Sequence, residues 1–299
     1  MLELFDRLFG KKEHPKLNLG DRLKQIESIY TGEDHDFPEA LPRYNGFTLV
    51  PGGLFPVIRV DGHCFHTFTR KLQKPFDRSM ERAMRDAMEE LVKFFQAKVA
   101  YTQSDEITVV LPDTTQAFSR KTHKLASLAA SVASVAFVSS MERQQPGFLE
   151  RNEGKLPVFD GRCFGLTRPE VSDCIVWRQR DCIRNAVSAA AQSKVSHTQL
   201  LGKNTDDKVA MLAESGIDMW NDYGPNSVFG TFARRRVYQV VLTEAEISEL
   251  PEKHNLRTGG SNTCIRSEIQ RIASPRLSTV DNLDAFLFDG EDFRERVGQ

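Results

Sequence analysis

The sequence predicts an α+β fold in which an antiparallel sheet carries helices on one face. From Asp21 onward, short strand-like runs alternate with longer helical ones, without a repeat or a low-complexity tract. The first six runs follow the order strand, helix, strand, strand, helix, strand, which is typical of the split βαβ, ferredoxin-like arrangement. The chain has 299 residues, 40% of them hydrophobic and 27% charged, so it can bury the core of one large or two small domains.

Local signals predict the first strand and helix. Residues 54–60 are apolar and follow a Pro-Gly-Gly loop at 51–53, which predicts a strand that ends at Asp61 and Gly62. Asp77 is a suitable N-cap for the next element, in which apolar residues recur at helical spacing. We therefore expect an amphipathic helix whose methionines belong to the core.

The second half of the core begins with two strand-like runs. Residues 98–102 and 107–111 are joined by four polar residues, which predicts a hairpin. A helix over about 115–141, a short strand near residues 158–159 and a third helix over about 170–192 complete the ferredoxin-like order.

The remaining elements are predicted as additions to this core. Residues 205–214 indicate a helix that stops before Gly216, and residues 227–232 with 236–242 indicate a second hairpin. A last helix begins at Glu244.

Charge and cysteine content exclude some classes of protein. Forty basic residues against 41 acidic ones give a net charge of −1, so any nucleic-acid surface must be local. Five scattered cysteines without a C-x-x-C pair predict reduced thiols rather than a disulfide framework or a zinc site. We find no secretory signal and no membrane-length apolar run, and we expect a cytoplasmic protein without membrane contact.

Three carboxylates could carry chemistry. Asp61 ends the first strand, and Asp105 and Glu106 lie in the hairpin turn, which a split βαβ sheet places beside that strand. Like charges at one edge resist ionisation unless a cation neutralises them, and carboxylate oxygens suit Mg²⁺. Two such ions would support an in-line phosphoryl displacement. The alternative is ordinary turn chemistry, because Asp-Gly and Ser-Asp-Glu are common in solvated turns.

Two motifs surround these carboxylates, IRVDGHCFHTFT at 58–69 and AKVAYTQSDEI at 97–107. They resemble motifs of the tRNA-histidine guanylyltransferase family, in particular its bacterial-type, guanylyltransferase-like members, which are 3′-to-5′ nucleotide polymerases. Further matches are FDGRCF at 159–164, WRQRD at 177–181, Arg184-Asn185 and GKNT at 202–205. The resemblance extends over about residues 19–238.

The resemblance implies a polymerase-type palm. We expect an N-terminal arm and helix at 1–44, a palm-type catalytic domain with added helices and a hairpin at 45–242, and an extension of unknown role at 243–299. In the family pattern Asp61 and Asp105 bridge two Mg²⁺ ions, the carbonyl group of Gly62 is a further ligand, and Glu106 supports the site as the third catalytic carboxylate.

The resemblance also implies a nucleotide site. The triphosphate would lie against the loop formed by Gly62, His63, Cys64, Phe65 and His66, with Ser104 and Lys74 as further contacts. His66 would stack on or hydrogen-bond to the nucleotide, unless it is a buried structural histidine. Arg59 would assist the triphosphate or form a structural ion pair, and the sequence leaves both open.

The implied reaction is addition of nucleotides to the 5′ end of tRNA, with GTP and ATP, and other nucleoside triphosphates in principle, as substrates. Members dedicated to tRNA-histidine carry His-Ile-Asn-x-x-Asn after Asp-Cys, whereas here Ile183-Arg184-Asn185 follows Asp181-Cys182. This variant favours templated repair of 5′-truncated tRNA. The resemblance also suggests a homo-oligomer, possibly a tetramer.

Candidate RNA contacts come from local polar clusters. They are Arg178, Arg180, Arg184, Asn185, Lys203 and Lys208, with Arg234 to Arg236 as a further cluster. The alternative for each is a solvated surface. Two other functions stay open, a palm-type nucleotide cyclase and a non-catalytic tRNA-binding or scaffolding protein.

Overall fold

The computed structural model describes residues 18–31, 49–252 and 262–296. Its described strands form one antiparallel sheet of six, in the order β4-β1-β3-β2-β5-β6. The strands are β1 (Phe55–Gly62), β2 (Val99–Gln103), β3 (Glu106–Val110), β4 (Phe159–Leu166), β5 (Thr231–Val241) and β6 (Thr263–Ala273). The four strands β4-β1-β3-β2 have the ferredoxin-like order, so the predicted α+β fold is confirmed.

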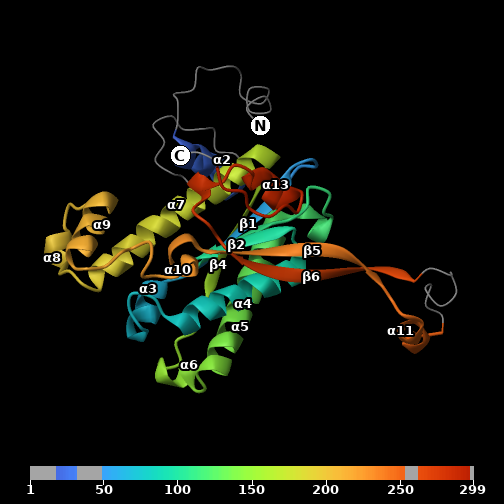
Figure 1. The fold of residues 1–299 in the computed structure, drawn as a ribbon, viewed down its shortest axis with the longest axis horizontal. Coiled ribbons are helices and arrows are strands. Elements are labelled where there is room, and N and C mark those ends of the chain that lie inside the picture. The colour runs from blue at the N-terminus through green and yellow to red at the C-terminus, as the bar shows by residue number, and fades with distance from the viewer. Residues whose placement is uncertain (1–17, 32–48, 253–261, 297–299) are drawn as a thin grey trace, which may run out of the picture.

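Two long helices cover one face of this sheet. They are α4 (Arg78–Phe95) and α5 (Thr122–Gln144), which lie side by side in Figure 1. The carboxylate of Asp77 accepts from the amides of Ser79 and Met80, both at 2.9 Å, and so forms the predicted N-cap of α4. Helix α5 approaches β4 closely because residue 161 is glycine: a Cβ there would lie 2.6 Å from the carbonyl oxygen of Ala126.

A third long helix, α7 (Arg168–Gln192), covers the opposite face. The register of the sheet shows this, because successive residues of a strand face opposite sides. Gly161 is paired with Val60 of β1 and faces α5. Glu106 is paired with the next residue of β1, Asp61, and contacts Arg178 of α7. Helix α2 (Leu19–Thr31) packs on β4 and α7. Figure 1 shows α7 running from α2 out to α8 (His197–Leu200) and α9 (Thr205–Glu214).

Short helical segments complete the described chain. They are α3 (Phe65–Phe68), α6 (Phe148–Arg151), α10 (Pro225–Phe229), α11 (Glu244–Glu249), α13 (Leu283–Phe288) and the 3₁₀ turns Thr69–Lys71, Ala117–Arg120 and Leu277–Thr279. The far half of α7 packs with α9 and α10 in a second apolar cluster, separate from the main core.

The second predicted hairpin is wrong. Residues 225–229 form α10, and a single strand of 11 residues, β5, follows Gly230, whose φ of +82° ends the helix. The three arginines at 234–236 lie within β5 rather than in a turn, and β5 pairs with β2 on one side and with β6 on the other. Residues on both sides of position 242 therefore belong to one sheet, while the domain boundaries at 44 and 242 stay predictions.

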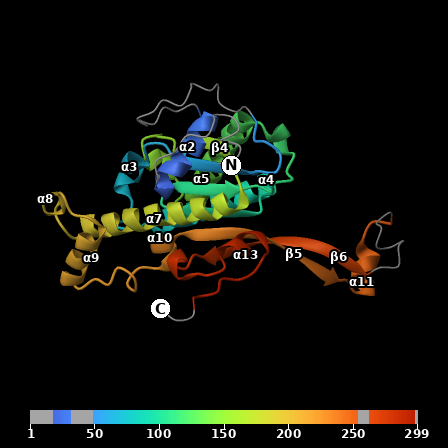
Figure 2. The ribbon, with the colours of Figure 1, turned by 90° about the horizontal axis from the view of Figure 1, so that it is seen from above.

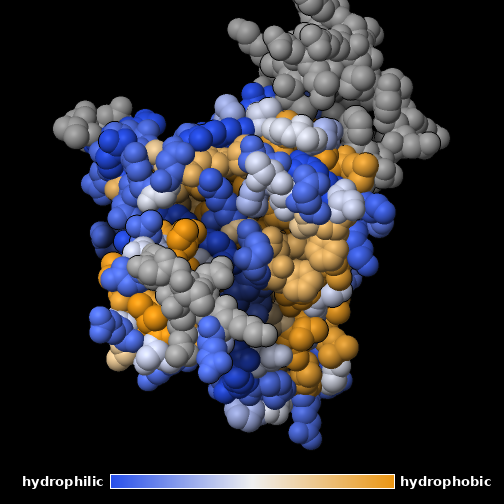
Figure 3. Space-filling model, turned by 90° about the vertical axis from the view of Figure 1, so that its right-hand side faces the viewer, coloured by the Kyte–Doolittle hydropathy of each residue, from blue (hydrophilic) through white to orange (hydrophobic). Residues whose placement is uncertain are grey.

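The distal halves of β5 and β6 form an arm. Strand β2 pairs with β5 only over residues 231–234, so residues 236–241 pair with 263–268 alone. Figure 2 shows this arm extending beyond the body to α11. Seen from the arm's end, the surface is mostly hydrophilic with an apolar area at one side (Figure 3).

Helix α5 is long and apolar enough, by length and composition, to pass as a membrane span. In the structure it packs along α4, β1 and β4, as core helices do.

Candidate active site

The sheet brings the three predicted carboxylates to one edge. Asp61 is the β1 partner of Glu106 on β3, and the amide of Gly62 donates to the carbonyl oxygen of Asp105 at 3.0 Å. This bond ties the β2–β3 turn to the end of β1. On its other side Asp61 is paired with Asp160 of β4. Directly opposed residues share a face, so Asp160, Asp61 and Glu106 form an acidic row.

The proximity of these carboxylates affects their pKa values. Burial, followed by the charges of Asp105, Glu106 and Asp160, raises the pKa of Asp61 to about 6, and the Arg59 guanidinium does not cancel this effect. Burial also raises the pKa of Asp105, although the Ser104 side chain and the charge of His66 act in the opposite direction. The edge therefore favours a neutralising cation.

Glu106 is in a different environment, although it is next to Asp105. Its Oε1 accepts from Nε of Arg178 at 2.7 Å, and its Oε2 lies 3.8 Å from Nε of Arg59. Arg59 also pairs with Glu27 of α2 at 2.8 Å, and Arg178 pairs with Asp181 at 2.7 Å. We call these five residues the buried ion-pair chain. Glu106 is neutralised within the protein and anchors β3 below the turn.

This chain bears on two predicted roles. Arg59 is buried and paired, which supports the structural alternative rather than contact with a triphosphate. Arg178 is only 8% exposed and faces the sheet, so the structure does not present it to an RNA at the surface. Sequence reasoning placed it with Arg180 because it could not see which side of α7 each residue occupies.

The loop after β1 separates core from surface residues. Phe65 is buried against Phe68, Phe137 and Phe159, so only its backbone is suited to contact a ligand. A Cβ at Gly62 would lie 2.4 Å from the Phe65 ring, which explains why glycine is needed there.

The exposed residues of this loop are His63, Cys64 and His66. The alternative of a buried structural histidine at position 66 is therefore wrong. His66 lies close enough to Asp105 for its charge to act on that carboxyl group.

A cavity of about 200 Å³ lies beside the β2–β3 turn. Its lining brings together Lys74 from the loop before α4, Ser104 from the turn and Asn185 from α7. Sequence analysis assigned the first two to a nucleotide and the third to RNA, without predicting that they share a cavity.

The other predicted RNA contacts are dispersed. Arg180 and Arg184 are exposed on α7, and Lys203 is exposed in the loop before α9. Lys208 donates from its Nζ to Ser188 at 3.0 Å. In the further cluster, Arg234 is buried and pairs with Asp292 at 2.9 Å, so it is not a surface cation.

Asp160 is the site residue that sequence reasoning missed. It is exposed on β4, and the motif FDGRCF that contains it was recognised but given no role. An acidic residue at the start of a strand that pairs with the first strand was the available signal.

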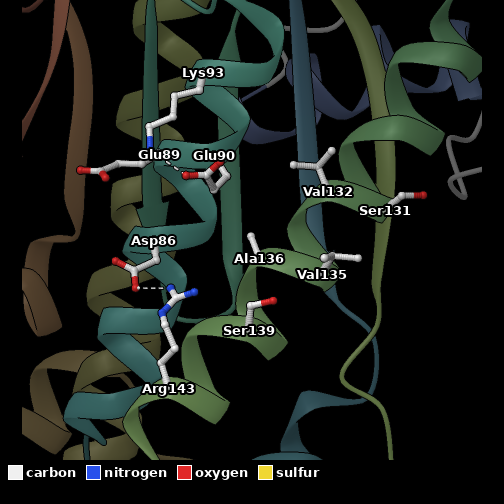
Figure 4. A pocket seen from close by; sticks show the side chains of 10 residues that line it. All are labelled: Asp86, Glu89, Glu90, Lys93, Ser131, Val132, Val135, Ala136, Ser139 and Arg143. Atoms are coloured by element: carbon white, nitrogen blue, oxygen red, sulfur yellow. Dashed lines mark hydrogen bonds and ion pairs between the residues drawn. The ribbon is translucent and has the colours of Figure 1, made fainter.

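A larger hollow of about 650 Å³ lies elsewhere, between α4 and α5. Four of its charged side chains pair within the hollow, Lys93 with Glu90 and Arg143 with Asp86 (Figure 4), and Glu89 pairs with Arg271. Since these helices cover the face opposite to Asp61, this hollow is not part of the candidate active site.

The carboxylate edge could bind Mg²⁺ with only a few ligands from the protein. Among the described residues, no group of three or more His, Cys, Asp or Glu side chains is arranged to hold a metal ion by itself. Mg²⁺ does not require such a cage, because it keeps water ligands and binds through one or two carboxylates plus substrate phosphates. Asp61, Asp105 and the carbonyl group of Gly62 are hard oxygen donors of this kind.

Comparison with known proteins identifies the family. The profile of tRNAHis guanylyltransferase (Thg1) matches residues 44–167, which contain β1, β2, β3 and β4. The tRNA(His) guanylyltransferase of Debaryomyces hansenii is 31% identical over 181 residues, covering 56% of this chain and 68% of that protein. The chain belongs to the tRNA(His) guanylyltransferase family. It is thus a nucleotidyltransferase with a palm-type fold.

Two solved structures extend the match beyond the profile. A bacterial tRNA(His) guanylyltransferase-like protein in complex with ATP is 28% identical with a TM-score of 0.61, covering 87% of this chain and 94% of that chain. A bacterial tRNA(His) guanylyltransferase-like protein in complex with GTP is 25% identical with a TM-score of 0.58, covering 90% of this chain and 99% of that chain. This member of the family therefore shares most of its length with the guanylyltransferase-like proteins.

Proposed function

We propose that this guanylyltransferase family member adds nucleotides to the 5′ end of tRNA in the 3′-to-5′ direction. The observation that carries the proposal is the unneutralised carboxylate edge formed by Asp61, Asp105 and Asp160, within the segment that matches the family. A scaffold or a non-catalytic RNA-binding module has no use for such an edge, because it raises the pKa of Asp61 and opposes folding at neutral pH.

Asp61, Asp105 and the Gly62 carbonyl group would hold two Mg²⁺ ions. Bound there, the ions would neutralise charge on the phosphoryl oxygens of the substrates. Ser104 and Lys74 line the neighbouring cavity and would bind the triphosphate, with Lys74 supplying positive charge. The exposed residues His63, Cys64 and His66 and the backbone of Phe65 would form the other wall of this nucleotide site.

The substrates follow from the family and from the cavity. The 5′ phosphate of a monophosphorylated RNA would first attack the α-phosphate of ATP, which forms the adenylylated 5′ end and releases pyrophosphate. The 3′-hydroxyl of an incoming nucleotide, usually GTP, would then attack the RNA 5′ phosphate and release AMP. A 5′-triphosphorylated RNA would release pyrophosphate instead. Related proteins are known in complex with each of these nucleotides.

We further propose templated repair of 5′-truncated tRNA as the physiological reaction. Ile183 stands where dedicated members carry histidine, and Asn185 faces the nucleotide cavity. A cytoplasmic location and a homo-oligomeric state, with a tetramer as its form, belong to the same proposal.

The test is incubation of the full chain with tRNAs that lack their first nucleotide, together with ATP, GTP and Mg²⁺, followed by sequencing of the products. We expect extension at the 5′ end, and preferentially of the nucleotide complementary to the opposing base. The Asp61→Ala protein is the control for contaminating activity. Lack of extension on a panel of such tRNAs would refute the proposal, and a cyclic product from GTP without RNA would indicate the cyclase.

A further inference from the structure

A positively charged hollow lies on the outer side of α7. It measures about 520 Å³ and is lined by Arg180 and Arg184 of α7, by Arg276 and by the first turn of α2, with Trp177 and Ile183 as its apolar part. Arg276 precedes the 3₁₀ turn Leu277–Thr279, within the C-terminal segment for which the sequence predicted no role. The tertiary structure thus adds a third arginine to the two that are neighbours on the helix.

The charge of this hollow is balanced only in part, at Arg184. No carboxylate lines it, and among the described residues neither Arg180 nor Arg276 has a carboxylate partner. Arg276 instead lies over the ring of Trp220, 5.2 Å from its centroid. Arg184 forms an ion pair with Asp181, and Asp181 also pairs with Arg178. For a chain with a net charge of −1, this is a concentrated cationic surface.

Helix α7 separates this hollow from the carboxylate edge. Arg178 and Arg180 are two positions apart and so project to nearly opposite sides of a helix that turns every 3.6 residues. Arg178 and Asn185 face the sheet and the nucleotide cavity, whereas Arg180 and Arg184 face the hollow. An anion in the hollow would therefore lie about 10 Å, one helix diameter, from the reacting groups.

We propose that the hollow binds the phosphate backbone of the RNA substrate through Arg180, Arg184 and Arg276. This inference rests on the proposed function, since it takes tRNA as the substrate. Arginine suits the role because its planar fork donates two parallel hydrogen bonds to a phosphate group. Three arginines from two segments, spread around an open hollow, match successive phosphates of a strand better than one compact triphosphate. Chemistry then takes place on one side of α7 and RNA is held on the other.

The test is tRNA binding by the full chain at several salt concentrations, with the double variant Arg180→Gln and Arg276→Gln. We expect the dissociation constant to rise about tenfold and the slope of log affinity against log salt to fall by about two, one for each lost phosphate contact. The affinity for GTP should not change, because the nucleotide cavity lies across the helix. The matched control is the double variant Arg143→Gln and Arg22→Gln, which removes the same charge from two partly exposed, carboxylate-paired arginines outside the hollow.

A second variant separates charge from packing. Arg276→Lys keeps the positive charge and should retain most of the salt slope, whereas Arg276→Gln should not. Unchanged tRNA affinity and slope in the double glutamine variant would overturn the proposal. Weaker GTP binding with normal tRNA binding would overturn it as well, because the hollow would then serve the nucleotide. If the unmodified protein itself bound no tRNA, the proposed function would fail before the hollow was tested.

Discussion

Two groups of charged residues lie on one face of the sheet, and the protein neutralises the charges of only one of them. The carboxylate edge contains Asp61, Asp105 and Asp160. Burial, followed by the negative charges of Asp105, Glu106 and Asp160, raises the pKa of Asp61 to about 6. The buried ion-pair chain contains Glu27, Arg59, Glu106, Arg178 and Asp181, in which acidic and basic side chains alternate. The chain of ion pairs lies deeper than the edge, yet it carries the compensating arginines.

This contrast teaches what each region depends on. A buried charge without a partner is costly, so the interior is balanced by residues of the protein itself. The carboxylate edge is partly open to solvent, so a cation from solution can neutralise its negative charge. We expect the two regions to respond differently to the loss of one charged side chain, and three experiments test that difference.

The largest effect is expected at the edge, on activity. Replacing Asp61 or Asp105 by alanine should lower the rate of 5′ nucleotide addition by about 1,000-fold or more, because donors for the ions and the transferring phosphoryl group are lost. Far-ultraviolet circular dichroism should show an unchanged fold. Measurable 5′ addition by both variants at a rate near that of the unmodified protein would remove these carboxylates from the mechanism.

A large effect is also expected in the buried ion-pair chain, but on stability. Arg178→Met leaves Glu106 buried with only the more distant Arg59, and should lower the free energy of unfolding by about 3–5 kcal/mol in urea titrations.

Two controls accompany this measurement. Arg184→Met removes an exposed arginine from Asp181, which keeps its ion pair with Arg178, and should cost about 1 kcal/mol or less. Combining Arg178→Met with Glu106→Gln should recover part of the loss. If Arg178→Met costs no more than Arg184→Met, the ion-pair chain is not the stabilising element we describe.

The smallest effect is expected on the pH dependence of folding stability when no metal is bound at the carboxylate edge. The pKa of Asp61 is raised in the folded protein, from an ordinary value of 3.8 to about 6, so the folded state binds more protons between these values and stability falls as pH rises through them. Asp61→Asn removes this penalty. In the presence of a chelator, the variant should be more stable than the unmodified protein by up to about 3 kcal/mol at pH 8, less the part that solvent screens at this partly exposed carboxyl group, and no more stable at pH 4.

Thermal unfolding at both pH values, with and without Mg²⁺, measures this difference. Mg²⁺ should stabilise the unmodified protein and have less effect on Asp61→Asn. An equal gain from the substitution at pH 4 and pH 8 would show that charge is not its cause.

Much of the fold could be predicted because its signals are local. The strand that ends at Asp61, the Asp77 cap and the hairpin around Ser104 are each encoded within a few residues, and the predicted helix over 205–214 matches α9. The second hairpin failed for the opposite reason. Strand β5 pairs with β6, some thirty residues later, and no local pattern around Arg235 records that partner.

That Asp61, Asp105 and Glu106 meet could be predicted from the sequence, because the succession of strands and helices and the Asp-Gly and Ser-Asp-Glu motifs are encoded by neighbouring residues. Which of these carboxylates are neutralised depends on tertiary packing. Glu106 acquires Arg178 from a helix 72 positions away, whereas Asp61 acquires Asp160 from β4. Burial and partners set the free energy of a charge, and both depend on how distant elements pack, so the roles of Arg59, Arg178 and Arg276 could not be read before the helices were in place.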